Sequence, residues 1–106
     1  MVGSIYYINM PYSNFKESKG RPVLIIKNLD KNDSLILPLT TNLQRVGIHI
    51  SNKDIEKGSL KKESVVIVPK ITAIDQSLIS DKKLIAVLKE KSFQKILQQL
   101  CQDFEC

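Results

Sequence analysis

The chain has no tryptophan, a single histidine, two cysteines and only two arginines. So few histidine and cysteine side chains, with no CxxC pair, give no cluster that holds a metal ion, and we expect neither a metal nor another cofactor. The sequence also lacks a P-loop, a GxGxxG turn and a nucleophile elbow, which argues against the enzymes built on those motifs. His49 stands between Ile48 and Ile50, and this alternation predicts a solvent-facing histidine on a strand.

Long apolar runs are missing too. No stretch reaches the roughly 18 apolar residues of a membrane-spanning helix, and the first ten residues lack the basic start and apolar core of a signal peptide. We therefore expect a cytoplasmic protein with no membrane partner. A length of 106 residues predicts one domain, residues 1–106. In a reducing compartment, Cys101 and Cys106 are expected to be free thiols.

The basic residues are mostly of one kind. The net charge is +5, and 14 of the 16 basic side chains are lysine, which leaves Arg21 and Arg45 as the arginines. A positive charge favours an anionic partner such as nucleic acid or an acidic protein segment. Lysine supplies a diffuse field, whereas the planar fork of arginine grips phosphate or carboxylate. Each arginine is therefore a candidate for a specific role.

Short apolar segments separated by polar connections predict a small β-barrel of five to seven antiparallel strands. Proline limits two of these segments: Pro22 stands at the first position of its strand, and Pro38 suggests that its strand is an edge or ends in a bulge. The polar stretch 52–62 reads as a loop. The expected strands are 4–9, 21–28, 34–40, 46–51 and 63–71.

The C-terminal third is expected to break near Lys89. Phe93, Ile96, Leu97, Leu100 and Phe104 form one apolar stripe at helical spacing. In one continuous helix, the apolar residues of LIAVL at 84–88 would fall on roughly the opposite side. A final strand at 84–88, followed by an amphipathic helix at 90–104, removes this conflict.

A few polar residues next to the strands are candidates for chemistry. Arg21 precedes a buried strand, the step Thr40-Thr41-Asn42 follows another, and Asp75 follows ITAI. Each also has a purely structural explanation: Arg21 pairs with Glu17, the TTN step closes a turn, and Asp75 caps a turn or helix.

The order and wording of these segments resemble the MazF/PemK family of toxins from toxin–antitoxin modules. Arg21 to Asn28 reads RPVLIIKN, close to the family's RPVLVIQN, and Pro38 to Asn42 reads PLTTN, close to its PLTSN. Ser64 to Asp75 corresponds to the strand that leads into the family's QIRTID. The resemblance covers almost the whole chain.

This resemblance implies an SH3-like barrel with a C-terminal helix, assembled as a homodimer, that cleaves single-stranded RNA. It assigns catalysis to Arg21 and Thr40, with supporting roles for Asp75 and Glu17. An acidic antitoxin protein is the other implied partner, its tail competing for Arg21 and the loop from Ser13 to Lys19. The implied RNA-binding residues are Lys16, Lys19, Thr41, Asn42, Lys70 and Thr72.

The chain departs from the family at one position that matters. The second arginine of QIRTID is replaced by Thr72, and Lys70 restores a positive charge without a fork. Two alternatives to an active ribonuclease therefore stay open. One is a weakly catalytic member that still binds RNA or antitoxin. The other is a gyrase poison of the CcdB type, but those toxins end in Trp-Gly-Ile, whereas this chain ends DFEC.

Overall fold

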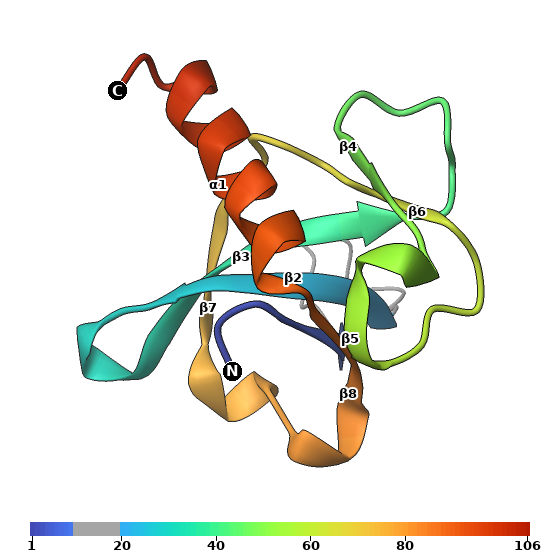
Figure 1. Cartoon of the computed structure of the whole chain (residues 1–106). Helices are drawn as coiled ribbons and strands as arrows, with labels where there is room; N and C mark the ends of the chain where they lie inside the picture. Colours follow the sequence, from blue (N-terminus) through green and yellow to red (C-terminus); the bar gives the residue numbers. More distant parts are fainter. Residues whose placement is uncertain (10–19) are drawn as a thin grey trace.

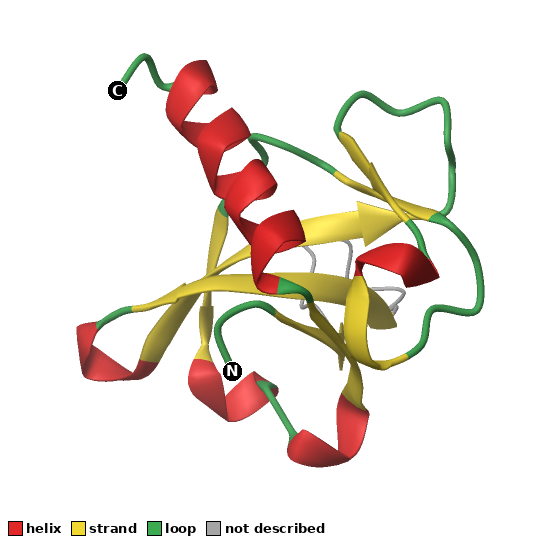
Figure 2. Cartoon of the chain, in the orientation of Figure 1, coloured by secondary structure: helices red, strands yellow, loops and turns green. Residues whose placement is uncertain are grey.

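The computed structural model describes residues 1–9 and 20–106, and in this part of the chain eight strands form one curled antiparallel sheet, a half-barrel crossed by a C-terminal helix (Figures 1 and 2). The sheet order is β4-β6-β3-β2-β1-β8-β5, and β7 pairs with β3 outside this path. This confirms the predicted mainly β fold with a C-terminal helix. The strands are β1 (Ser4–Asn9), β2 (Gly20–Asn28), β3 (Asp33–Thr40), β4 (Ile48–Ile50), β5 (Ile55–Gly58), β6 (Ser64–Val66), β7 (Thr72–Asp75) and β8 (Leu84–Leu88).

The strand β2 is buried on both of its faces, which explains why its sequence is apolar without alternation. Leu24 belongs to the main core beneath the helix, whereas Val23 and Ile25 belong to a second cluster on the other face of the sheet. The second cluster also contains Tyr6, Ile8, Ile36 and Ile74. Every apolar residue from Val23 to Ile26 is therefore removed from water.

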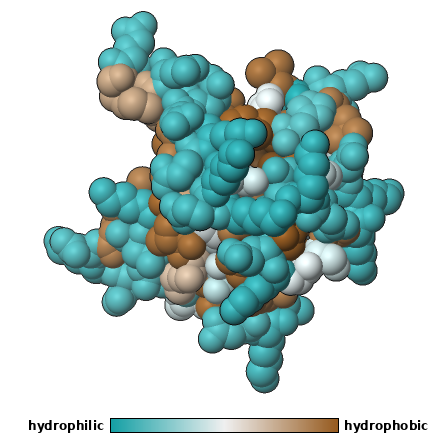
Figure 3. Space-filling view, viewed as in Figure 1, coloured by the Kyte–Doolittle hydropathy of each residue, from teal (hydrophilic) through white to brown (hydrophobic). Residues whose placement is uncertain are grey.

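The helix α1 spans Glu90–Asp103, and Lys89 is its N-terminal cap, so the predicted break between strand and helix is confirmed. Phe93, Ile96 and Leu100 from the predicted stripe are buried in the main core. Phe104 is an exception: its side chain is 58% exposed because the helix has already ended. The outer surface on the side that carries α1 is largely hydrophilic (Figure 3).

The prediction that Pro38 marks an edge strand is wrong, because β3 is paired on both sides. On one side β3 pairs with β2; on the other it pairs with β7 at Asp33 to Ile36 and with β6 at Leu39 and Thr40. Pro38 falls in the gap between these two partners, where its missing N–H breaks no ladder bond on that side. Its carbonyl accepts a hydrogen bond from the Ile67 N–H at 2.9 Å.

Three other expectations need correction. The stretch 52–62 is not only loop, since it holds a 3-10 turn, η2 (Asn52–Asp54), and the strand β5. The stretch 63–71 is not one strand: β6 ends at Val66, and a turn around Pro69 leads to the unpredicted strand β7. The strand predicted at 46–51 shortens to β4. The other turns are η1 (Asp30–Asn32), η3 (Gln76–Leu78) and η4 (Asp81–Lys83).

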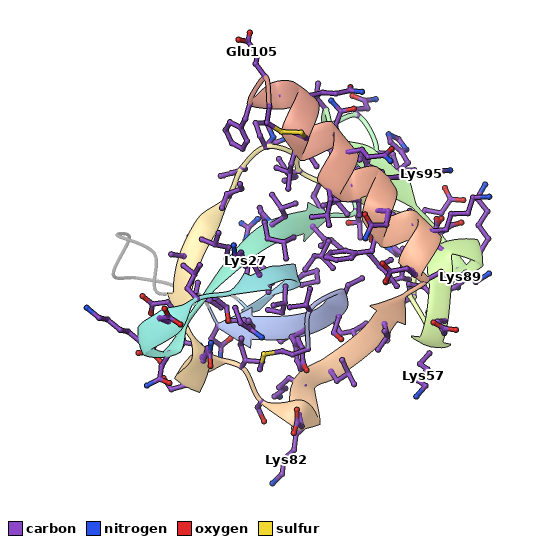
Figure 4. All side chains as sticks on the ribbon, turned by 60° about the vertical axis from the view of Figure 1, so that its left-hand side comes forward. Lys27, Lys57, Lys82, Lys89, Lys95 and Glu105 are labelled. Carbon is purple, nitrogen blue, oxygen red and sulfur yellow. A yellow bond between two sulfur atoms is a disulfide. The ribbon has the colours of Figure 1, made fainter. Side chains whose placement is uncertain are left out.

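The expectation of two free thiols is also wrong, because the structure joins Cys101 and Cys106 in a disulfide (Figure 4). Glu105 adopts a left-handed conformation with φ 57°, which turns the chain back on the helix end. The N–H of Cys106 then donates to the carbonyl of Cys101 at 2.9 Å. The two Cα atoms lie 5.1 Å apart, a separation that a disulfide spans.

The connection between β4 and β5 is fixed by side chains rather than by a strand ladder. The amide of Asn52 bonds both backbone groups of Leu60, donating to its carbonyl at 3.1 Å and accepting from its N–H at 2.7 Å. The carboxylate of Asp54 accepts from the Ser51 N–H at 2.9 Å and from the Ser92 hydroxyl at 2.8 Å. Asp54 therefore ties the first turns of α1 to η2.

Replacing Asp54 with alanine should lower the free energy of unfolding by about 1–3 kcal/mol, because two hydrogen bonds to a charged acceptor are lost. Ser92→Ala removes one of the two bonds and should cost less. Urea unfolding of both variants measures the difference. The exposed Asp30 serves as control through Asp30→Ala; equal losses for Asp30 and Asp54 would contradict this role for the Asp54 carboxylate.

Candidate functional site

Arg21 and Thr40 lie near the ends of the two paired strands β2 and β3. The register sets Val23 opposite Pro38 and Leu24 opposite Leu37, and the ladder ends at Val23 and Pro38. Continued by two residues, this register would set Arg21 opposite Thr40 on the same face of the sheet, where directly opposed side chains have Cβ atoms about 5 Å apart. Arg21 is exposed and Thr40 is half-buried. Both side chains stand where the two strands reach the surface.

The segment after β3 orients the hydroxyl of Thr40. The N–H of Asn42 donates to Thr40 Oγ1 at 3.1 Å, and the Asn42 side-chain oxygen accepts from the Gln44 N–H at 3.1 Å. Thr40 Oγ1 accepts this one hydrogen bond and keeps its own O–H as a donor. Thr41 and Asn42 are exposed beside it.

Asp75 is not brought to this pair within one chain. Asp75 lies opposite Asp33, the first residue of β3, whereas Thr40 is the last residue of that strand. Seven residues of extended strand separate Asp33 from Thr40 by about 23 Å. Thr72 lies opposite Ile36, between these ends, and the exposed Lys70 belongs to the turn before β7. Lys16, Lys19 and Glu17, also predicted for the site, lie outside the described residues.

In the structure, Asp75 acts as a cap. Its carboxylate accepts a hydrogen bond from the Ser77 N–H at 2.8 Å, at the start of η3. Hydrogen bonds from the backbone and side chain of Ser77 hold the pKa of Asp75 below its ordinary value. The structure thus shows the capping role that is one of the two explanations for Asp75.

A cavity that sequence reasoning missed opens next to the Arg21–Thr40 pair. Its volume is about 490 Å³, and it is lined by Tyr7, Pro22, Leu39, Thr41, Ser59, Leu60, Lys61, Lys62, Ser64 and Ile85. These residues come from strands and loops far apart in the sequence. The polar sequence from Ser59 to Lys62 does not indicate that these residues line an apolar cavity.

Other predictions concern metals and membranes. In residues 1–9 and 20–106, no group of three or more His, Cys, Asp or Glu side chains is arranged to hold a metal ion. Within the same ranges, no helix has the length and apolar character needed to cross a membrane. His49 is exposed on β4, as its alternating neighbours predicted.

Three proteins of known structure have a fold similar to that of this chain. The toxin MazF-mt6 of Mycobacterium tuberculosis has a TM-score of 0.70 and 17% identity, with 96% of both chains covered. MazF (Form-I) of Deinococcus radiodurans has a TM-score of 0.70 and 14% identity, with 99% of this chain and 96% of that chain covered. An endoribonuclease of a mycobacterial species has a TM-score of 0.68 and 16% identity, with 99% of this chain and 90% of that chain covered.

The sequence itself identifies the family. Residues 1–104 match the family described as PemK-like, MazF-like toxin of type II toxin–antitoxin system, and the chain belongs to it. No curated protein matches the sequence. The resemblance seen in RPVLIIKN and PLTTN is therefore confirmed.

The cap at Asp75 predicts a pH-dependent contribution to stability. Because the folded pKa is lowered, the charged carboxylate stabilises the fold above its unfolded pKa, and this stabilisation is lost as the pH falls through the folded pKa. Asp75→Asn keeps an oxygen that accepts from Ser77 but removes the charge. Wild type should therefore be the more stable at about pH 7, and the difference should vanish near pH 2. Urea unfolding at both values tests this; a difference that grows on acidification would contradict it.

Proposed function

We propose that the chain is the toxin of a type II toxin–antitoxin module and cuts single-stranded messenger RNA in the cytoplasm, which stops translation and growth. Membership of the toxin family supports this proposal. The observation that carries it is the register of β2 and β3, which runs to Val23 opposite Pro38 and, continued by two residues, would set Arg21 opposite Thr40 where both strands reach the surface. An arginine fork beside a hydroxyl suits the binding of a phosphodiester.

Cleavage of RNA without a metal needs three events. The 2′-OH loses its proton and attacks the phosphorus, a dianionic phosphorane forms, and the 5′-oxygen leaves as it gains a proton. Arg21 stabilises the phosphorane through two N–H donors and is a donor to the leaving oxygen. Arginine is a poor base because its guanidinium stays protonated in proteins. Thr40 supplies a further hydrogen bond through the O–H that its turn leaves available.

The base that accepts the 2′-OH proton is the open part of the mechanism. Asp75 is engaged with Ser77 at the far end of β3, which leaves it out of reach of Thr40 in the same chain. Glu17 stays a candidate base on the strength of the family resemblance alone.

Binding of the RNA strand is assigned to residues around the pair. Thr41 and Asn42 follow Thr40 directly, and Thr72 and Lys70 lie farther along β3 and before β7. Lys16 and Lys19 complete this proposed set. The remaining lysines provide a general field: Lys57, Lys82, Lys89 and Lys95 project from separate parts of the surface (Figure 4).

Thr72 is the observation behind a second candidate function. An uncharged side chain stands where the family's pattern has an arginine, which removes one phosphate donor from the path of the RNA. A member weakened in this way would bind RNA or antitoxin while cleaving slowly. The gyrase-poison alternative is favoured by no comparable observation.

The purified protein should cleave a single-stranded RNA with EDTA present, leaving a 2′,3′-cyclic phosphate and a 5′-hydroxyl. Arg21→Ala should lower the rate by about 100-fold or more, the usual cost of losing a donor to the transition state. Gel analysis of an end-labelled RNA measures the rate, and mass spectrometry identifies the ends.

The matched control is Arg45→Ala, which removes the other arginine from the exposed loop between β3 and β4. It should cleave close to the wild-type rate. Loss of cleavage with EDTA that Mg²⁺ restores would overturn the mechanism. RNA binding without cleavage by the wild type would favour the weakly catalytic alternative.

We also propose that the toxin acts as a homodimer. Among residues 1–9 and 20–106, β4 pairs with β6 alone, so its outer edge is a place where another chain can add. Apolar side chains lie exposed just before it, with Val46 85% and Leu43 42% accessible to solvent. A second copy covering this edge would bury both.

Sedimentation equilibrium at micromolar concentration should give the mass of two chains. Val46→Glu should shift the equilibrium towards one chain, because a charge would be buried in the contact. Asp30→Ala, far from β4 along the chain, should leave the mass unchanged. A wild-type mass of one chain would contradict the homodimer.

A further inference from the structure

The disulfide between Cys101 and Cys106 lies at the end of α1, and neither cysteine belongs to the two hydrophobic clusters (Figure 4). Every residue from Cys101 to Cys106 is exposed. Exposed disulfides are the ones that act as labile or regulatory bonds, because a thiol has access to their sulfur atoms. A reductant therefore reaches this bond while the main core under α1 stays packed.

The end of α1 has the hydrogen bonds of a Schellman motif. Phe104 is the C-terminal cap, so Glu105 and Cys106 are the two residues that follow the cap. The Cys106 N–H donates to the Cys101 carbonyl at 2.9 Å, and the Glu105 N–H donates to the Gln102 carbonyl at 3.1 Å. In this motif, the two residues joined by the longer bond often make an apolar side-chain contact. Here the two cysteines occupy these positions, and the contact is a covalent bond.

The local sequence opposes this turn. Glu105 has φ 57°, in the left-handed region, at a position where helix ends usually have glycine. Asp103 and Glu105 add negative charge at the helix end where the dipole is already negative. Within Glu90–Asp103, the last turn has no basic residue, and the Gln99 amide that donates to Asp103 at 3.0 Å is uncharged. The disulfide therefore holds a turn that the surrounding residues do not favour.

We propose that Cys101 and Cys106 are a reversible redox site: the disulfide fixes the end of α1, and reduction by a dithiol frees it. The inference rests on the proposed function only for the cytoplasm, where disulfides are usually transient or redox-sensing. Two free thiols and one disulfide are then two states of the same chain. The order of the helix end thereby depends on the redox state around the protein.

The exchange with the dithiol has two steps. A thiolate of the dithiol attacks one cysteine sulfur, the bond between Cys101 and Cys106 breaks, and the released thiolate takes up a proton. The second thiolate of the dithiol then attacks the mixed disulfide, and the other cysteine leaves and is protonated. Two electrons and two protons pass to the protein, and the dithiol becomes a disulfide.

The effect of reduction is confined to the helix end. Leu100 is buried in the main core, and its carbonyl accepts a hydrogen bond from the Phe104 N–H at 3.0 Å. The earlier part of α1 is held by the burial of Phe93 and Ile96, to which the disulfide does not contribute. Reduction should therefore loosen residues 101–106 and leave the rest of the fold in place.

The first experiment measures the redox state of the purified protein without denaturant. In a glutathione buffer poised as in the cytosol, an alkylating reagent should label both cysteines, and mass spectrometry counts the labels. In oxidised glutathione, the protein should carry no label and keep the mass of one chain. A bond that stays intact until urea is added would overturn the proposal, as would glutathione adducts or covalent dimers in place of the internal bond.

The second experiment measures amide hydrogen exchange by NMR in both redox states. Exchange at the Glu105 and Cys106 N–H groups should become about tenfold faster on reduction, which corresponds to the usual penalty of a left-handed residue other than glycine. Glu105→Gly removes this penalty and should keep the turn in the reduced protein. The matched variant Glu105→Ala removes the charge but keeps a Cβ, so it should lose the turn on reduction. Equal exchange rates in oxidised and reduced wild type would overturn the proposal.

A double variant, Cys101→Ser with Cys106→Ser, is the control for both experiments, because the chain has no other cysteine. Its exchange rates at the helix end should match those of the reduced wild type in every buffer. Rates that change with the redox buffer in this variant would assign the effect to another group and overturn the proposal. No readout uses cleavage, so a protein that fails to cut RNA would refute the proposed activity while these comparisons still decide the inference.

Discussion

The change of partner along β3 is the constraint on which the rest of the structure depends. One strand pairs with β2 from Ser34 to Pro38 on one side, and with β7 and then β6 on the other. The sheet built around this strand has the main core under α1 on one face and the cluster around Ile25 and Ile36 on the other. Beyond Pro38, β3 leaves β2 for β6 and ends at Thr40. The strand β3 therefore both lies within the half-barrel sheet and ends at the candidate site residue Thr40.

Most of the fold could be predicted from local sequence because apolar periodicity decides it. The apolar run from Val23 to Ile26 predicted the strand β2. In one continuous helix, the apolar residues of 84–88 would lie on the side opposite those of 90–104, and this predicted the break near Lys89. Predictions failed where tertiary pairing overrides local pattern. Pro38 looked like an edge residue, because no sequence pattern shows that a strand exchanges one neighbour for another at that point.

The site could be predicted only in part, for a related reason. Arg21 and Thr40 were predicted because each adjoins a strong strand, and the structure puts them near the ends of the neighbouring strands β2 and β3. The cavity was not found, since Tyr7, Leu60 and Ile85 are brought together by pairing between distant strands. The turn at Glu105 that joins the two cysteines was likewise hidden, because a positive φ at a glutamate has no clear sequence signal.

The side-chain amide of Asn52 separates the packing at the cavity from the charge beside it. It holds both backbone groups of Leu60, a residue of the lining, whereas Lys61 and Lys62 are exposed and take no part in these two bonds. Substitutions of the two lysines therefore change the charge at the cavity without removing the bonds that hold Leu60.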